Sequence, residues 1–356
     1  MDPNRYIRQT ALKEFGPKAQ KKLMKARVLI VGAGGLGVPV LQYLNAMGVG
    51  TLGVVEQDVV SISNLHRQVL YTERDIGKPK LEMAFKKLKA QNTNTRLRGY
   101  DTFLMASNAL DIIKDYDIVI DASDNFPTRY LINDACVMLN KPFVYGGLQG
   151  FEGQVSVFNY QGGPTYRCLF PNMPTIDEIP NCNINGVLGI LPGIIGNFQA
   201  LETIKMITGI GEVLKGKLLL YNALDQTIKK MSFSLQEESL NIIGLKNTYG
   251  IVSASPFSEI TVDQLKDLIN SQGTVQIIDV RTQEEFEAYK IPNSIHIPLH
   301  ELKDRYDDID LKKPIYLICQ SGKRSALALE QLKNEFSEIA LYSVHGGINT
   351  YVAVCS

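Results

Sequence analysis

A glycine-rich segment directly after an apolar run constrains this chain more than any other feature. Residues 28–31 read Val-Leu-Ile-Val, and residues 32–37 follow in the pattern GxGGxG before a helical stretch. Glycines let the backbone approach a phosphate, and the N-terminus of the next helix supplies N–H donors and positive potential. The candidate phosphate-binding glycines are Gly32, Gly34, Gly35 and Gly37. Glu56 lies about 20 residues on at a predicted strand end, where an acidic side chain can bind ribose hydroxyls. A nucleotide site is predicted, and this much suits an NAD or FAD enzyme equally well.

Short apolar strands alternate with helices through the first 235 residues. Residues 51–56 and 117–121 read as strands, and residues 78–91 read as a helix with one apolar face. Further strands are predicted at 154–158, 217–221 and 227–233, and a long apolar helix at 192–207. This alternation predicts an α/β, Rossmann-like domain with a mainly parallel sheet that is covered on both faces.

A polar segment at residues 236–257 divides the chain. It contains Gly244, Gly250 and Pro256 together with several serines and asparagines, which is typical of a linker. A second alternating pattern follows, with strands predicted at 276–280, 295–297, 315–318 and 340–344. About 100 residues suffice for a small α/β domain with its own core. We therefore predict domains at 1–235 and 258–356, joined by a linker at 236–257.

Composition excludes several classes of protein. The 356 residues are 45% hydrophobic, and Lys+Arg balance Asp+Glu at 37 each, which argues against nucleic acid or an anionic membrane as the main partner. Residues 28–55 are uncharged and long enough to span a bilayer, but seven glycines and Pro39 break them into short runs. Five cysteines without a CxxC pair indicate a reducing compartment. We expect a soluble, cytoplasmic protein.

Polar residues beyond the glycine pattern favour adenylation over hydride transfer. The candidates are Ser63, Asn64, Arg67, Lys80, Asp124 and Asn125. A triphosphate needs cations for its phosphates and a carboxylate for Mg²⁺, whereas a hydride-transfer site needs few such charges. Considered alone, Arg67 or Lys80 is better interpreted as a solvated surface charge than as a phosphate ligand. As a spaced set, these residues indicate an ATP site.

At these residues the sequence resembles the ubiquitin-activating-like adenylyltransferases, specifically the bacterial MoeB and ThiF enzymes, from Arg5 to about residue 233. The resemblance implies adenylation, with MgATP, of the C-terminal glycine of a ubiquitin-like sulfur-carrier protein ending in Gly-Gly. It also implies that Gly35, Glu56 and residues 63–67 contact ATP. Arg67 and Lys80 would neutralise phosphates, and Asp124 would hold Mg²⁺ with Asn125 beside it. Arg8 matches an arginine that crosses a homodimer interface to the phosphates of the partner subunit.

The resemblance also bears on two cysteine positions, Cys182 and Cys168. Cys182 lies in a Pro/Asn-rich loop and would by itself read as an unreactive cysteine. It matches the family cysteine that takes the activated carrier as a thioester or an acyl disulfide. Many relatives also bind structural zinc through two CxxC pairs. Here Cys168 alone remains of the first pair, and residues 231–234 contain no cysteine, so we expect no structural zinc.

The second domain contains a candidate persulfide loop. Cys319 follows a predicted strand and opens a helix beside Lys and Arg, the electropositive setting that favours a thiolate. The loop comprises Cys319, Gln320, Ser321, Gly322, Lys323 and Arg324. Four residues separate Cys319 from Arg324, which suits a sulfur atom better than the phosphate of a cysteine phosphatase. Residues 258–356 resemble the rhodanese sulfurtransferase domain, which implies that Cys319 carries a persulfide and that Arg324 helps to hold the loop.

Together the two domains predict one sequence of reactions. The first adenylates the carrier, and the second, recharged by an upstream persulfide or other sulfur donor, supplies the sulfur for a C-terminal thiocarboxylate. Such carriers serve molybdopterin, thiamine or tRNA thiolation pathways, of which we favour molybdopterin. Three alternatives remain at this stage: an NAD- or FAD-binding oxidoreductase, a tRNA-modifying adenylating relative, and a scaffold with a degenerate site.

Overall fold

The computed structural model describes residues 3–174, 186–246, 249, 259–272, 275–336 and 339–355. The chain forms two compact units, Met1–Tyr249 and Gly250–Ser356. The boundary between them falls inside the segment that the sequence predicts as a linker.

The first unit is built on an eight-stranded sheet with the order β3-β2-β1-β4-β5-β6-β7-β8. Strands β1 to β5 pair in parallel, and β6, β7 and β8 extend the sheet through antiparallel pairs. The mainly parallel sheet predicted from the sequence is thus confirmed. The strands are β1 Arg27–Val31, β2 Thr51–Val55, β3 Arg96–Tyr100, β4 Ile118–Asp121, β5 Phe143–Gln149, β6 Glu152–Phe158, β7 Lys217–Asn222 and β8 Ile228–Ser232.

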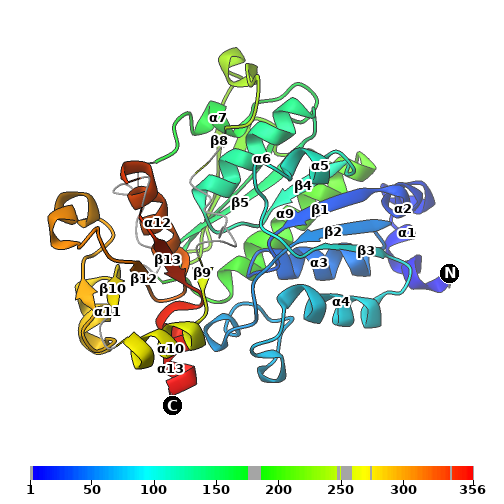
Figure 1. The fold of residues 1–356 in the computed structure, drawn as a ribbon. Coiled ribbons are helices and arrows are strands. Elements are labelled where there is room, and N and C mark those ends of the chain that lie inside the picture. Colours follow the sequence, from blue (N-terminus) through cyan, green and yellow to red (C-terminus); the bar gives the residue numbers. More distant parts are fainter. Residues whose placement is uncertain are drawn as a thin grey trace. The chain divides into compact units, whose positions relative to one another are not determined.

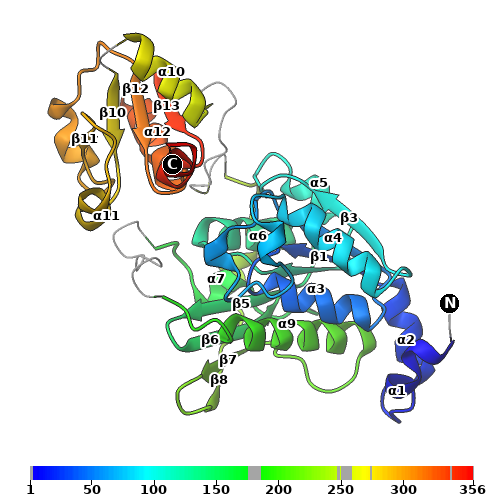
Figure 2. The same cartoon turned by 90° about the horizontal axis from the view of Figure 1, so that it is seen from below.

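Helices cover both faces of this sheet (Figures 1 and 2). One face carries α2, α3, α4 and α9, with α9 packed against α3, β5 and β6, and the other carries α5, α6 and α7. The helices are α1 Ile7–Thr10, α2 Gly16–Lys25, α3 Gly37–Ala46, α4 Lys80–Gln91, α5 Ala109–Ile113, α6 Phe126–Met138, α7 Tyr166–Leu169 and α9 Leu191–Thr208. Short 3-10 turns lie at Pro3–Tyr6, Ile62–Asn64, Glu73–Asp75 and Glu237–Leu240.

Local chemistry explains where the elements nearest the nucleotide loop begin and end. The four apolar residues of β1 are buried, as expected of a central parallel strand. Gly32 has a φ of +101°, and a Cβ on Gly37 would lie 1.9 Å from the Gly32 carbonyl oxygen, so both positions require glycine. Helix α6 begins where the Asn125 side chain accepts a hydrogen bond from the Thr128 N–H. Helix α9 ends at Gly209, whose φ is +80°.

The second unit is a five-stranded parallel sheet with the order β11-β10-β12-β13-β9. Helix α12 packs on one face of this sheet, and α10 and α13 pack together on the other. The strands are β9 Glu259–Ile260, β10 Gln276–Asp279, β11 Ile295–His296, β12 Ile315–Ile318 and β13 Leu341–Val344. The helices are α10 Val262–Gln272, α11 Gln283–Ala288, α12 Lys323–Glu335 and α13 Gly347–Cys355, with a 3-10 segment at Leu302–Asp308.

The described part of the segment predicted as a linker contacts the first unit. The Gln236 N–H and the Ser239 hydroxyl lie against Cys168 at the end of α7. Farther along, buried Tyr249 donates a hydrogen bond of 2.6 Å to Asp134 of α6, a carboxylate that Arg167 also contacts. Hydrogen bonds of Gln236, Ser239 and Tyr249 therefore attach the described part of this segment to the rest of the first unit.

Edge strand β3 was not predicted. Its sequence, Arg-Leu-Arg-Gly-Tyr, carries two charges and one glycine in five residues, and an edge strand that is not fully buried tolerates such residues. Among the described residues, no helix is both long enough and apolar enough to cross a membrane.

Candidate active sites

The glycine loop joins three parts of the first unit at the carboxyl edge of its sheet. A Cβ on Gly32 would lie 2.8 Å from the carbonyl oxygen of Ala122, which follows β4. A Cβ on Gly35 would lie 3.0 Å from Pro192 at the start of α9 and 3.5 Å from Cγ of Arg67. Parallel α/β sheets bind nucleotides at this edge. Gly35 and Arg67, which the sequence places in one site, are therefore neighbours.

The predicted ribose ligand, Glu56, is buried beneath the glycine loop. Its Oε2 accepts a hydrogen bond of 2.8 Å from the Ala33 N–H, and its Oε1 accepts one of 2.9 Å from the Asp58 N–H. Burial raises the pKa of Glu56, and the nearby charge of Lys80 opposes that rise. Glu56 therefore fixes the backbone of the loop in addition to any contact with a ligand.

The two predicted phosphate cations occupy different environments. The Lys80 side chain is 5% exposed, and its Nζ lies 3.2 Å from Oδ2 of Asp58. Arg67 is partly exposed, and its Nη1 donates a hydrogen bond of 2.9 Å to the Ser63 carbonyl oxygen. The same turn contains Asn64, whose Oδ1 accepts from the Ser61 N–H at 3.2 Å. Ser63, Asn64 and Arg67 thus form one local group beside Gly35, and Lys80 forms a second with Asp58 and Glu56.

The turn after β4 exposes one carboxylate and buries another. Asp124 and Asn125 are exposed, and Asn125 Nδ2 lies 3.3 Å from Asp124 Oδ1. Asp121 is completely buried, and its Oδ1 accepts hydrogen bonds from the N–H and the hydroxyl of Ser123 at 3.0 and 2.5 Å. Because Ser123 directly precedes Asp124, the buried carboxylate holds the turn that presents the exposed one.

Two residues that the sequence analysis did not single out, Arg129 and Gln199, complete the support of this turn. Arg129 of α6 is buried, with its Nε 4.0 Å from Oδ2 of Asp121 and its Nη2 3.4 Å from the Ser123 carbonyl oxygen. Gln199 of α9 donates a hydrogen bond of 2.7 Å to the Asp121 carbonyl oxygen. Burial raises the pKa of Asp121, although the charge of Arg129 opposes the rise.

In the second unit, the Cys319 loop curls around its own sulfur. Cys319 directly follows β12 and is completely buried, and the Gly322 N–H lies 3.1 Å from its Sγ. Gly322 has a φ of +90° and is the residue from which α12 begins. Arg324 points its guanidinium at Glu285, with hydrogen bonds of 2.6 and 2.7 Å. The backbone, more than the arginine, therefore faces the thiol.

Two family models match these two units. The ThiF family model matches residues 6–242, which is more than half of the chain. The chain belongs to the ThiF family. A rhodanese-like domain model matches residues 261–353, so this ThiF-family chain also carries a rhodanese-like domain. The predicted resemblance to both families is confirmed.

Curated relatives extend over nearly the whole ThiF-family chain. The adenylyltransferase and sulfurtransferase MOCS3 of Arabidopsis thaliana is 34% identical over 98% of this chain and 83% of its own length. A Porphyra purpurea protein named "probable molybdopterin-synthase adenylyltransferase" is 39% identical over 98% of this chain and 93% of its own length. The sulfur carrier protein adenylyltransferase of Thermus thermophilus is 52% identical over 64% of this chain and 86% of its own length. The chain is accordingly an adenylyltransferase and sulfurtransferase, and the oxidoreductase alternative is not supported.

A solved structure agrees on the fold. Escherichia coli MccB with ATP superposes with a TM-score of 0.58 and 23% identity, covering 66% of this chain and 73% of its own. At this identity the likeness supports the Rossmann-like architecture alone.

Among the predicted nucleotide-site residues that the structure describes, Arg8 lies away from the nucleotide loop of its own chain. It lies on α1, whose neighbours Tyr6 and Gln9 hydrogen-bond to Asn92 and to the Met47 carbonyl oxygen, at 3.1 Å each. Met47 precedes β2 and Asn92 precedes β3, so α1 is attached at the amino edge of the sheet (Figure 1). The glycine loop lies at the carboxyl edge, about 16 Å away along a five-residue strand at about 3.3 Å per residue.

Cys182 and Cys168 are the other two cysteines to which the sequence analysis drew attention. Cys182 lies outside the described residues. Cys168 is partly buried, and its sulfur lies 3.3 Å from the backbone N–H groups of Thr165 and Gln236 and 3.0 Å from the Ser239 hydroxyl. Burial raises the pKa of Cys168, but the hydrogen-bond donors together lower it by more. The pKa of Cys168 is therefore below the ordinary value for a cysteine thiol. The cysteine left from the family zinc pattern is thus surrounded by hydrogen-bond donors.

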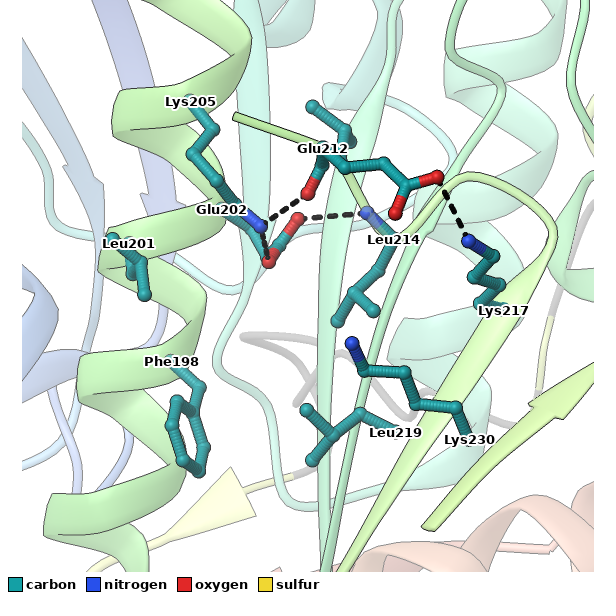
Figure 3. A pocket seen from close by; sticks show the side chains of 10 residues that line it. Phe198, Leu201, Glu202, Lys205, Glu212, Leu214, Lys217, Leu219 and Lys230 are labelled. Atoms are coloured by element: carbon teal, nitrogen blue, oxygen red, sulfur yellow. Dashed lines mark hydrogen bonds and ion pairs between the residues drawn. The ribbon is translucent and has the colours of Figure 1, made fainter. Parts of the chain in front are cut away.

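A cavity of about 180 Å³ in the first unit is separate from the nucleotide loop (Figure 3). It begins at Phe198, about 9 Å along α9 from Pro192 at ~1.5 Å per residue. Four of its five charged residues pair with one another: Lys205 contacts Glu202 and the Glu212 carbonyl oxygen, and Lys217 contacts the Glu212 carboxylate (Figure 3). We assign no substrate to this cavity.

Proposed function

We propose that this enzyme adenylates the C-terminal glycine of a ubiquitin-like sulfur carrier ending in Gly-Gly, and then converts that glycine to a thiocarboxylate. One observation carries the proposal. A single chain joins a ThiF-family nucleotide loop to a rhodanese-like cysteine loop with a backbone N–H directed at the sulfur. Two relatives match nearly the whole of this chain. One is named an adenylyltransferase and sulfurtransferase, and the other a probable molybdopterin-synthase adenylyltransferase. We therefore favour the molybdopterin pathway over thiamine or tRNA thiolation.

In the first step, the carrier carboxylate attacks the α-phosphorus of ATP, and pyrophosphate leaves. Bringing a carboxylate to a triphosphate requires positive charge, which Arg67 and Lys80 supply from two sides of the glycine loop. Glycines at 32, 34, 35 and 37 leave room for the phosphates against backbone N–H groups. Glu56 holds this loop and receives the ribose, and Ser63 and Asn64 line the turn beside Gly35.

The residues present also fit a magnesium ion. Among the described residues, no cluster of three or more His, Cys, Asp or Glu side chains could enclose a metal. Mg²⁺ in nucleotide sites needs no such cluster, because it is held by one or two carboxylates, waters and the substrate phosphates. The exposed carboxylate of Asp124, with Asn125 beside it, meets that requirement at the carboxyl edge. When bound there, Mg²⁺ would neutralise phosphate charge.

In the second step, a persulfide on Cys319 supplies the sulfur. Its terminal sulfur attacks the carbonyl of the acyl-adenylate, the carbonyl–oxygen bond to AMP breaks, and AMP leaves with the electron pair. A thiolate then attacks Sγ of Cys319, which breaks the sulfur–sulfur bond and releases the thiocarboxylate. Cys182 is our candidate for that thiolate, or for an earlier thioester with the carrier. The attack leaves a disulfide between Cys319 and that cysteine. A cytoplasmic thiol reductant opens this disulfide, and an upstream persulfide donor then recharges the freed Cys319 thiolate.

We infer that the enzyme works as a homodimer in the reducing cytoplasm. Arg8 is fixed at the sheet edge opposite its own nucleotide loop, so a role on the phosphates requires the site of a partner subunit. Cys136, Cys168 and Cys319 are free thiols, and a reducing compartment keeps them so.

The proposal is tested with purified enzyme and candidate carriers that end in Gly-Gly. Carrier-dependent exchange of pyrophosphate into ATP is expected first. After a sulfur donor is added, the intact mass of the carrier should change from a carboxylate to a thiocarboxylate. Carriers that exchange pyrophosphate but never gain sulfur would refute the second half of the proposal. A panel of carriers that support neither reaction would refute both halves.

A further inference from the structure

The start of α13 is bonded directly to the backbone of the Cys319 loop. The Ile348 N–H donates a hydrogen bond of 2.8 Å to the Cys319 carbonyl oxygen, and the Asn349 N–H donates one of 3.1 Å to the Gln320 carbonyl oxygen. The first N–H groups of a helix normally lack partners within the helix. Here two of them bind the loop that precedes α12, so the two segments are fixed to each other.

Gly347 makes this close approach possible. A Cβ at this position would lie 2.1 Å from the Cys319 carbonyl oxygen and 2.8 Å from the Ser321 nitrogen. Its φ is +59°, a conformation that other residues adopt only with strain. A side chain here would therefore push the loop away from α13 or distort the turn.

Side-chain contacts also hold Gln320, the second residue of the Cys319 loop. Gln320 Nε2 donates a hydrogen bond of 2.5 Å to Asn349 Oδ1, and Gln320 Oε1 accepts one of 3.2 Å from Arg281 Nη1. Arg281 is buried and pairs with buried Asp279 at 2.7 Å. Because buried charges held on several sides move little, Gln320 is attached to a rigid part of the unit.

These contacts determine which backbone groups face the sulfur. The carbonyl oxygens of Cys319, Gln320 and Gly322 accept from the Ile348 N–H, the Asn349 N–H and the Ser325 hydroxyl respectively. With these carbonyl oxygens bound to other groups, the Gly322 N–H reaches Sγ. A backbone N–H directed at a sulfur stabilises its anionic form.

We propose that Gly347 and Asn349 are positioning residues for sulfur transfer, because they hold the Cys319 loop in the conformation that receives the persulfide. Neither residue needs to touch the donor or the acceptor. The inference rests on the proposed function, since it assigns the persulfide to Cys319. It predicts that weakening the contact with α13 slows the chemistry at Cys319 and leaves binding of a small sulfur donor nearly unchanged.

The test uses the full-length enzyme with thiosulfate as donor and cyanide as acceptor. The Cys319 thiolate takes the outer sulfur of thiosulfate and releases sulfite, and cyanide then removes that sulfur as thiocyanate and restores the thiolate. Gly347→Ala should lower kcat by about tenfold or more, since small misplacements of reacting groups cost that much. Asn349→Ala should lower kcat about threefold to fivefold, the effect of one hydrogen bond. Asn349→Asp keeps the acceptor for Gln320 and should retain most of kcat. KM for thiosulfate should change less than about twofold in all three variants, since positioning affects the transition state and not donor binding.

Control variants separate the possible failures. Gly244→Ala is the matched control, because its Cβ would meet nothing within 4 Å, and its activity should equal that of the native enzyme. If Gly347→Ala does not fold, the Asn349 pair decides the question. A folded Gly347→Ala enzyme with native kcat would overturn the proposal, as would equal losses in Asn349→Ala and Asn349→Asp or a change confined to KM. Native enzyme that gains no sulfur on Cys319 would instead overturn the proposed function.

Discussion

The guanidinium of Arg324 forms two hydrogen bonds, of 2.6 and 2.7 Å, with the two carboxylate oxygens of Glu285. Both side chains are less than one-third exposed. A bidentate pair of this kind fixes orientation as well as charge. Arg324 therefore connects the start of α12 to α11, and its positive charge is already balanced before any sulfur is bound.

Glu285→Gln should weaken the second unit and slow sulfur transfer. The substitution removes one charge-assisted hydrogen bond from a partly exposed pair, so we expect a loss of about 1 kcal/mol in unfolding free energy. Sulfur transfer from thiosulfate should fall several-fold because the start of α12 loosens, whereas carrier-dependent pyrophosphate exchange should not change. Equal losses in both reactions would contradict this assignment.

The stability difference between native enzyme and Glu285→Gln should disappear in acid. Partial burial raises the pKa of Glu285, but the hydrogen bonds and charge of Arg324 lower it more, so the net pKa is below the ordinary value. A carboxyl with a depressed folded-state pKa stabilises above its unfolded pKa, about 4.3, and loses that contribution as pH falls through the folded value. Thermal unfolding at pH 7 and near pH 3 checks this. A difference that persists in acid would show that the ion pair is not its source.

Arg129→Met should destabilise the first unit more at high pH than at low pH. Without Arg129, the buried Asp121 carboxylate lacks its counter-charge, at a cost of about 3–5 kcal/mol. Burial already raises the pKa of Asp121, and loss of the arginine raises it further. The folded state then binds a proton more tightly than the unfolded state, so acidification restores stability. In urea unfolding, the loss of unfolding free energy in Arg129→Met relative to the native enzyme should be smaller at pH 5.5 than at pH 8.

Asp121→Asn is the matched control for that prediction. It leaves Arg129, which cannot lose its proton, buried without a counter-charge. The loss of unfolding free energy in Asp121→Asn should therefore stay nearly constant between pH 8 and pH 5.5. If both variants respond equally to pH, Asp121 is not the group that titrates.

The two half-reactions should separate by mutation. Cys319→Ala removes the sulfur acceptor but leaves the nucleotide loop intact, so pyrophosphate exchange should persist while no thiocarboxylate forms. Asp124→Ala removes the candidate Mg²⁺ ligand and should lower exchange by about 100-fold or more, in line with the loss of a group that stabilises transition-state charge. The Asp124→Ala enzyme should still take sulfur from thiosulfate. Loss of both reactions in Cys319→Ala would refute the division of labour.

Local sequence patterns predicted the parts of each site that lie on one turn. The glycine loop, the Ser123–Asn125 turn and the Cys319 loop each follow a buried strand, and strand-end turns have recognisable residues. The supports came from far along the chain and had no such signal. Gln199 reaches Asp121 across 78 residues, and Arg324 reaches Glu285 across 39. Arg129 is the exception in distance, because it lies six residues from Ser123. Arg129 and Asn349 both lie inside ordinary helical patterns, which do not show which turn each side chain contacts.

Ser239→Ala should make Cys168 less reactive toward alkylation at neutral pH. The Ser239 hydroxyl is 3.0 Å from the sulfur and is among the groups that lower the pKa of Cys168. Removing it should raise that pKa toward the ordinary value and reduce the thiolate fraction. Alkylation with iodoacetamide across pH, read from peptide masses, checks this. Cys136 is the internal control, because burial raises its pKa and it should react only on unfolding. Unchanged Cys168 reactivity would mean that the donors of Thr165 and Gln236 suffice.

Metal analysis of the purified enzyme should find no stoichiometric zinc. A structural zinc site of this family type needs four thiolates in tetrahedral geometry. Thr165 stands where the first CxxC pair would begin, and residues 231–234 contain no cysteine. Instead, Cys168 hydrogen-bonds with Gln236 and Ser239, which follow residues 231–234 in the chain. Addition of a strong chelator should therefore leave the melting temperature of the first unit unchanged. One zinc per chain, or a melting temperature that falls with chelator, would show that other ligands complete the site.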